Sequence, residues 1–167
     1  MRVAVLSIAS SLALSGCSSA ADTGALVALD DSPATVCAPA DAEGRVVFGV
    51  SYVKNESGEP VDVVDVELVG ADGMELLGFE LRSPDDEDAN VVGLDYDEFG
   101  PASIALPQQV AAGESRVVLV GVEIRADVGG EADALRITFR SADRAHGTAE
   151  TSIAMQVVSE GTVCDMG

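Results

Sequence analysis

The sequence has few aromatic and few cationic residues. It contains no tryptophan, only 4% aromatic residues, and nine lysines and arginines against 29 aspartates and glutamates. With a formal net charge of −20, the chain lacks the basic face that releases counterions from a phosphate backbone, which argues against nucleic acid as a partner. The same charge argues against electrostatic adhesion to anionic lipid and favours attraction for cations.

The sequence motifs of common enzymes are also absent. There is no G-x-S-x-G, no H-E-x-x-H and no glycine-rich phosphate loop followed by a helix. The only histidine, His146, lies between two expected strands, where we expect an exposed hairpin residue, and no cysteine or serine motif is placed to use it. We therefore expect a protein that is not an enzyme and that needs no cofactor, with calcium as the one candidate ligand.

Apolar residues are plentiful, at 47% of a 167-residue chain, which is enough for one domain with a core. Valine, leucine, isoleucine and alanine dominate, and branched side chains suit a pleated sheet. Apolar segments of strand length, separated by Gly, Pro and Asp turns, lie at 46–53, 61–69, 74–81, 103–106, 116–125, 134–140 and 151–158. This pattern predicts an all-β fold, an antiparallel Ig-like β-sandwich of about seven strands.

The alternation of apolar residues predicts which faces are buried. Within 46–53, residues Val46, Phe48, Val50 and Tyr52 share one parity, so we expect them on one face. In 61–69 and in 74–81 the apolar positions change parity partway along the segment. A shift of this kind predicts a β-bulge or a strand that changes sheets.

The first seventeen residues have the order of a secretory signal peptide. Arg2 supplies a positive charge, residues 3–14 are apolar, and small residues follow. The apolar run is too short to span a membrane, which takes about 20 residues. It closes with LSGC at residues 14–17, which resembles the lipobox of bacterial lipoproteins. The resemblance implies that Cys17 receives a diacylglycerol and becomes the mature N-terminus; the alternative is an ordinary signal peptide with an incidental cysteine.

This resemblance also implies a location and a division of the chain. The protein is expected in the cell membrane, lipid-anchored and facing the extracytoplasmic side. Residues 1–16 form the signal peptide that is removed, residues 17–36 the lipidated N-terminus and tether, and residues 37–167 the β-sandwich. A short strand is allowed within the tether at 25–29. The layout is similar to that of small β-sandwich lipoproteins of high-GC bacteria, a resemblance without a diagnostic motif that names no activity.

Two further cysteines remain once Cys17 is assigned to lipid. Cys37 and Cys164 bracket almost the whole folded region, and an even pair in an exported protein favours a disulfide. A redox pair would be expected as C-x-x-C, and a zinc site would need further ligands nearby. Neither pattern is present, so the sequence predicts a structural Cys37–Cys164 disulfide.

The segment 83–101 is the most acidic stretch of the chain and contains the candidate calcium ligands. Calcium takes six to eight oxygen ligands, several from carboxylates on a flexible loop. The candidates are Asp86, Asp88, Asn90, Asp95 and Asp97. An EF-hand is excluded because Val91 stands where that loop needs glycine and Asp97 where it needs glutamate. A looser calcium site and a solvated surface loop remain open.

Two aromatic residues in the same segment, Tyr96 and Phe99, are candidates for contact with a partner. They can equally fold back over the end of the sandwich. The function expected from the sequence is a lipid-anchored cell-envelope protein that presents a non-catalytic β-sandwich to an envelope protein partner. The alternative is an envelope lipoprotein that binds a cation or a small ligand through the acidic residues 84–98.

Overall fold

The computed structural model describes residues 24–30, 32–99, 106–125 and 128–164, and they form an all-β domain. The single helical element there is the four-residue turn α1 (Tyr96–Phe99). The strands are β1 (Leu26–Ala28), β2 (Ala34–Pro39), β3 (Arg45–Asn55), β4 (Val61–Val69), β5 (Met74–Arg82), β6 (Val92–Leu94), β7 (Gln108–Val110), β8 (Ser115–Ile124), β9 (Gly130–Ala132), β10 (Ala134–Arg140), β11 (His146–Glu150) and β12 (Ile153–Val158).

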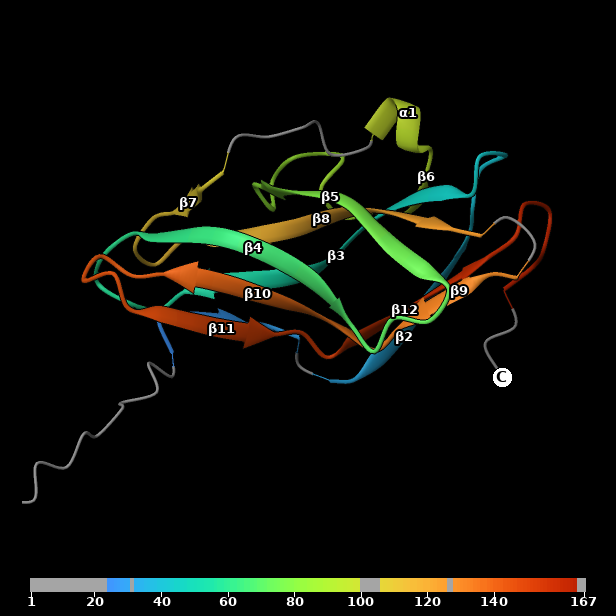
Figure 1. Ribbon diagram of the computed structural model, residues 1–167. Helices are drawn as coiled ribbons and strands as arrows, with labels where there is room; N and C mark the ends of the chain where they lie inside the picture. The colour runs from blue at the N-terminus through green and yellow to red at the C-terminus, as the bar shows by residue number, and fades with distance from the viewer. Residues whose placement is uncertain (1–23, 31, 100–105, 126–127, 165–167) are drawn as a thin grey trace, which may run out of the picture.

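The strands are arranged in three sheets. The first sheet has the order β1-β3-β8-β5, with β6 also paired to β3, and the second has the order β11-β10-β4-β7. The third sheet is β2-β12-β9, in which β2 and β12 are parallel; all other pairings are antiparallel. Figure 1 shows the third sheet at one end of the molecule, and the β10–β11 turn at the other end. The predicted antiparallel sandwich is confirmed, with one parallel pairing added.

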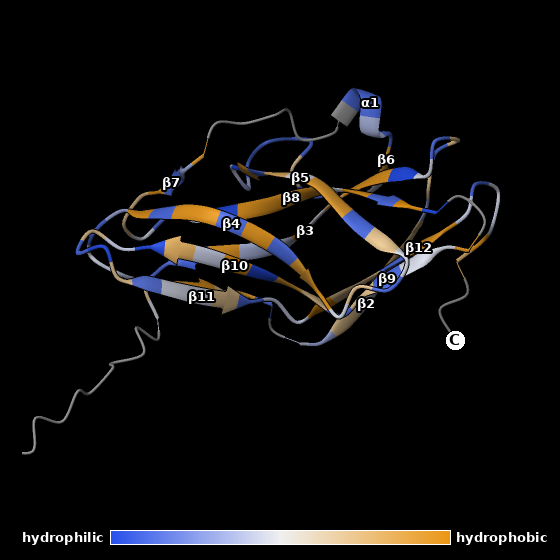
Figure 2. Cartoon of the chain, in the orientation of Figure 1, coloured by the Kyte–Doolittle hydropathy of each residue, from blue (hydrophilic) through white to orange (hydrophobic). Residues whose placement is uncertain are grey.

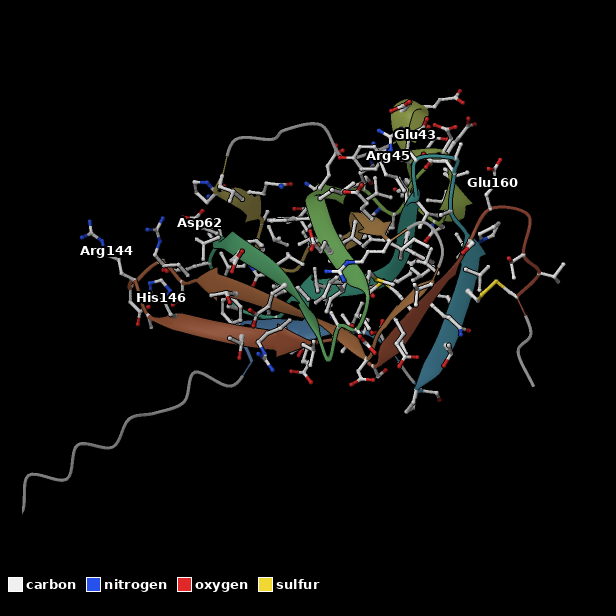
Figure 3. The ribbon with its side chains drawn as sticks, turned by 45° about the vertical axis from the view of Figure 1, so that its right-hand side comes forward. Glu43, Arg45, Asp62, Arg144, His146 and Glu160 are labelled. Carbon is white, nitrogen blue, oxygen red and sulfur yellow. A yellow bond between two sulfur atoms is a disulfide. The ribbon has the colours of Figure 1, made fainter. Side chains whose placement is uncertain are left out.

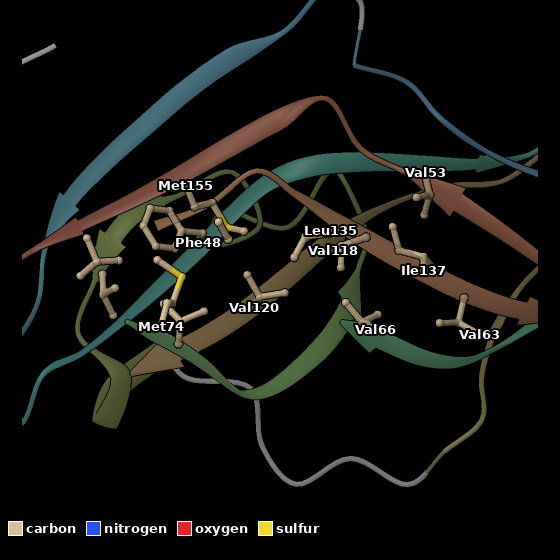
Figure 4. Close-up of a cluster of buried hydrophobic side chains, with 14 of the residues drawn as sticks. Phe48, Val53, Val63, Val66, Met74, Val118, Val120, Leu135, Ile137 and Met155 are labelled. Atoms are coloured by element: carbon tan, nitrogen blue, oxygen red, sulfur yellow. The ribbon is translucent and has the colours of Figure 1, made fainter. Parts of the chain in front are cut away.

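The core lies between the facing sheets. Its largest fully buried side chains include Phe48, Phe139, Leu135 and Ile137. Figure 4 shows Phe48 beside Met74 and Met155 at one end of the core. In β10, Leu135, Ile137 and Phe139 are buried, whereas Arg136, Thr138 and Arg140 between and after them are partly exposed. Figure 2 shows the same alternation as bands of polar and apolar residues along the strands.

Both predicted parity shifts are β-bulges. In β4, Thr138 of β10 pairs with Asp65 while the next residue pairs with Val63, so Val64 is the extra residue. In β5, the register with β8 shifts between Leu76 and Gly78, so Leu77 is the extra residue. The bulges allow β4 and β5 to keep apolar residues on the core side before and after the shift.

The predicted face of β3 is right for the first half of the strand and wrong for the second. Val46 and Phe48 belong to the core, but the core residue of the second half of the strand is Val53 rather than Val50 or Tyr52. The register with β8 shifts between Phe48 and Ser51. A bulge at this point exchanges the two faces of the strand, which places Tyr52 on the outer side of the first sheet.

The number of strands and the start of the fold also differ from the prediction. The described residues contain twelve strands instead of about seven, because four strands have only three residues and β11 has a polar sequence without alternation. The fold includes β1, which was expected as a short strand at 25–29, and β2, which begins at Ala34 within the expected tether. The predicted strand at 103–106 lies mostly outside the described residues, and β7 follows it at Gln108.

A buried asparagine fixes the turn between β3 and β4. Asn55 is 0% exposed. Its Nδ2 donates to the carbonyl oxygens of Glu59 (2.8 Å) and Val110 (3.0 Å), and its Oδ1 accepts from the Ser57 amide (2.9 Å). Because every polar atom of the side chain has a partner, burial of this amide is not penalised. The turn at 56–60 is therefore tied to β7 of the second sheet.

Helices long and apolar enough to cross a membrane were sought in the described part of the chain, and none was found.

Candidate interaction surface

The predicted disulfide is present. Cys37 in β2 is bonded to Cys164, with 5.8 Å between their Cα atoms and 127 residues between them in sequence. Cys37 pairs with Gln156 of the neighbouring strand β12, and Cys164 follows the end of that strand. The bond, drawn in yellow in Figure 3, therefore closes the C-terminal segment onto the edge of the third sheet.

The loop between β5 and β6, residues 83–91, is fixed to the outer face of the first sheet, and we call it the acidic loop. Ala89 is 0% exposed although its neighbours Asp88 and Asn90 are exposed. The Gly49 amide donates to the Val91 carbonyl (2.7 Å), and the Val91 amide donates back to the Gly49 carbonyl (3.2 Å). These bonds dock the loop at the bulge of β3, so the loop has a defined position and is not a freely solvated segment.

Gly49 is required for this docking. A Cβ on Gly49 would overlap the carbonyl oxygen of Ala89 and lie 2.8 Å from Leu119 Cδ1. We expect Gly49→Ala to lower the free energy of unfolding by about 1–3 kcal/mol, as overpacking does, and to speed hydrogen exchange of the Val91 amide. Denaturant unfolding and amide exchange measure the two effects.

A matched control for Gly49→Ala is Gly58→Ala. A Cβ on Gly58 has no heavy atom within 4 Å, so we expect a stability change within about 0.5 kcal/mol. If Gly49→Ala kept the wild-type unfolding midpoint and the wild-type protection of the Val91 amide, the docking role of Gly49 would be wrong.

Three of the five candidate calcium ligands accept hydrogen bonds from other groups of the protein. Asp86 accepts from the Ser83 amide (3.1 Å). The Asn90 side chain accepts from the hydroxyl of Tyr52. Asp95 Oδ1 accepts from the Asp97 amide (2.8 Å), at the start of α1. The two carboxylates stabilise local turns of the backbone, whereas the Asn90 side chain joins the loop to β3.

Among the described residues, no group of three or more His, Cys, Asp or Glu side chains could hold a metal ion. The structure brings Asp86 and Asn90 into one turn, and Asp95 and Asp97 into another, but it does not gather the five candidates into one site. Calcium binding by this loop stays a prediction from the sequence.

Arg45 holds α1 against the start of β3. Its guanidinium contacts Asp97 (3.0 Å), Asp41 (3.5 Å) and Glu43 (3.5 Å), and it lies 5.3 Å from the centre of the Tyr96 ring. The hydrogen bond with Asp97 is the largest of the influences that raise the pKa of Arg45 above its usual value. Figure 3 shows Arg45 and Glu43 side by side at this end of the molecule.

This contact changes the roles of the predicted interaction residues. Tyr96 is half-buried under Arg45, so it serves in part to hold α1 in place. Phe99 closes α1, and its side chain lies outside the described residues. No sequence pattern singles out Arg45, because the arginine and the tyrosine are more than forty residues apart and meet only in the fold.

A glutamine from the second sheet covers the edge of the first. The Leu81 amide in edge strand β5 donates to Gln108 Oε1 (2.8 Å), and Gln108 Nε2 donates to the Phe79 carbonyl (3.4 Å). A side-chain amide therefore makes the two hydrogen bonds that a neighbouring strand would make. An edge strand that is capped in this way is protected from pairing with another chain.

Two turns and a shallow cleft form the end of the molecule that carries Arg45. Gly73 and Gly129 have φ angles of +67° and +74°, and a Cβ on Gly73 would lie 2.8 Å from the Gly129 carbonyl oxygen. The cleft beside these turns has a volume of about 300 Å³, and Asp72, Glu131 and Gln156 are among its lining residues. Carboxylates thus gather here as they do around Arg45. We call this part of the molecule the acidic end.

Residues 1–23 lie outside the described residues, and with them Cys17 and the LSGC motif. Lipid attachment at Cys17 therefore stays a prediction.

The strands, sheets and core together define an all-β sandwich domain. No protein-family model and no curated protein matches the chain. A PapD-like domain of human CEP192 (PapD-like domain 7) is similar at a TM-score of 0.42 and 10% identity, with 95% of this chain and 97% of that chain covered.

Two further solved structures show weaker likeness. A non-cellulosomal cohesin from the archaeon Archaeoglobus fulgidus has a TM-score of 0.28 and 12% identity, with 81% of this chain and 91% of that chain covered. A family 123 glycoside hydrolase from Clostridium perfringens has a TM-score of 0.35 and 11% identity over 75% of this chain, but only 23% of that enzyme is covered. At such low scores the likenesses carry no argument about activity or ligands.

Proposed function

We propose that the protein is a lipid-anchored component of the cell envelope that presents its β-sandwich to another envelope protein. The observation that carries this proposal is the LSGC motif at residues 14–17, placed after a charged residue and a short apolar run. Lipid on Cys17 anchors the chain stably when two or more acyl chains are attached, at about 0.8 kcal/mol per buried methylene.

The described domain supports an interaction role through its rigid, charged surface. Strands hold the acidic loop and α1 in fixed positions, through Gly49, Ala89 and Arg45. A surface that is ordered before binding loses little conformational entropy when a partner docks. Its negative charge favours a partner with a basic patch, because complementary potentials raise the rate of association.

The anchor is tested by replacing one atom of Cys17. We expect Cys17→Ser to abolish incorporation of a labelled fatty acid and to move the protein from the detergent phase to the aqueous phase on phase separation, because serine has no thiol to carry the diacylglycerol. The neighbouring substitution Ser18→Ala is the control and should keep both properties. Labelling of Cys17→Ser at the wild-type level would refute the anchor.

The interaction is tested separately by crosslinking in intact cells. A partner that is recovered with the wild-type chain, and whose crosslinks map to the acidic loop or α1, would support the proposal. Absence of any reproducible crosslinked protein would contradict it.

A further inference from the structure

The two ends of the sandwich differ in how negative they are. One end consists of the turns 56–60, 111–114 and 141–145 with the adjoining strand ends, and we call it the turn end. Among the described residues these turns and strand ends carry five carboxylates, Glu56, Glu59, Asp62, Glu114 and Asp143, and four cationic side chains, Lys54, Arg116, Arg140 and Arg144. The adjoining loop adds Asp86, Glu87 and Asp88, which line one pocket with Arg82 and Arg116. The turn end is therefore negative, but less so than the opposite end.

The opposite, acidic end is strongly negative. Its described residues include eleven carboxylates and only two cationic side chains. They are Asp41, Glu43, Asp72, Glu75, Asp95, Asp97, Glu98, Glu123, Glu131, Asp133 and Glu160, against Arg45 and Arg125. Figure 3 shows Arg144, His146 and Asp62 at one end of the molecule, and Glu43, Arg45 and Glu160 at the other. Strand β3 runs from Arg45 to Asn55, so the two ends are roughly 30 Å apart at about 3.3 Å per residue.

The chain enters the domain at the turn end. Leu26 of β1 pairs with Asn55, and the Glu56 amide donates to the Ala25 carbonyl (2.8 Å). Ala25 and Leu26 are 8% and 2% exposed, so this entry point is fixed. From Cys17 to Gly24 there are seven residue steps, which span at most about 25 Å even when fully extended.

From these observations we infer that the turn end faces the membrane and that the acidic end points away from it. The inference rests on the proposed lipid anchor at Cys17. The short link holds the turn end near the bilayer, and an anionic headgroup surface repels the acidic end more strongly than the turn end. The repulsion acts within about 8 Å at physiological salt, which is the range reached when the domain tilts onto the bilayer.

Two exposed positions allow a direct test in the full-length protein. Gly58 lies in the turn end, where a side chain meets open space, and Val128 lies beside the cleft of the acidic end and is 79% exposed. Cys37 and Cys164 are bonded to each other, and a lipidated Cys17 has no free thiol. A fluorescent donor can therefore be attached to Gly58→Cys or to Val128→Cys alone, in protein purified from membranes and placed in vesicles with acceptor-labelled headgroups.

We expect energy transfer to the headgroups to be about twofold or more higher from position 58 than from position 128, given their separation of roughly 30 Å. The difference should be larger in vesicles of phosphatidylglycerol than in vesicles of phosphatidylcholine, and it should shrink in high salt. Equal transfer from both positions in anionic vesicles, or more from position 128, would overturn the inference.

Lipid attachment at Cys17 is measured before the energy transfer and independently of it. Mass spectrometry and flotation with the vesicles report whether Cys17 carries lipid. A chain without lipid refutes the anchor and the orientation together, whereas a floating chain with equal transfer from the two labels refutes the orientation alone. If the difference in energy transfer between positions 58 and 128 were the same in anionic and in neutral vesicles, the role of the acidic end would be refuted.

Discussion

Replacing Cys37 and Cys164 together by serine is expected to lower the free energy of unfolding by about 5 kcal/mol, the largest effect that we expect from any change to the described domain. The disulfide closes a loop of 127 residues, and the chain-entropy account assigns a loop of this size about that much restriction of the unfolded chain. Denaturant unfolding of the wild type and of the double variant measures the difference.

Reductant supplies the control for this prediction. The reduced wild-type chain should unfold at the midpoint of the double variant, and reductant should not move the midpoint of the variant itself. Since β2 and β12 pair along six residues without help from the bond, the folded spectrum should be unchanged. A double variant with the wild-type midpoint would show that the bond contributes nothing to stability.

Phe48→Ala is expected to lower the free energy of unfolding by about 3–5 kcal/mol. Phe48 is 0% exposed and lies among the side chains shown in Figure 4, with Met74 and Met155 beside it. Truncation removes the burial energy of the ring and leaves a cavity that strands on both sides hold open. The same unfolding measurement, with both midpoint and slope recorded, gives the size of the loss.

The half-buried Phe79 of β5 is the matched comparison. Phe79→Ala removes the same atoms from a position that packs against the core but is partly exposed. The loss should be clearly smaller, because less apolar area leaves water on folding and the site can collapse. Equal losses for the two substitutions would show that Phe48 does not hold the special place in the core that its burial indicates.

Much of the sandwich could be predicted because local alternation reports the buried face. The pattern in β10 places Ile137 and Phe139 in the core, and the parity shifts in 61–69 and 74–81 identify the bulges of β4 and β5. The Cys37–Cys164 bond followed from pairing the cysteines that remained after Cys17. In these cases the buried face, the bulge or the disulfide can be inferred from residue types and their spacing alone.

The rest depends on contacts between distant segments. The face of β3 reverses at the bulge around Gly49, the same place where the loop around Ala89, some forty residues later, docks. A glycine inside an otherwise apolar strand indicates that another segment of backbone approaches closely, and Gly49 is the sequence feature that points to the docked loop. Strand β11 (His146–Glu150) is polar and is held by its backbone pairing with β10, so no alternation marks it.

The candidate site was only partly predictable for the same reason. Acidic residues identify the loop, but sequence does not tell which carboxylates are used in turns. Asp95 accepts a hydrogen bond at the start of α1, and Asp97 pairs with Arg45, a residue that no sequence pattern singles out. The role of Gln108 on the edge of β5 also appears only when two sheets are brought together.

The parallel pairing of β2 with β12 has a consequence for the order in which the chain can fold. One partner, Ala34–Pro39, is made early in synthesis and the other, Ile153–Val158, near its end. The third sheet cannot assemble until almost the whole chain has emerged from the ribosome or from a membrane channel. Pairings of such long sequence separation close slowly, and β2 stays an uncovered template for wrong partners in the meantime. The late arrival of one strand, more than the stability of the finished sheet, thus sets the period in which this protein is most vulnerable to aggregation.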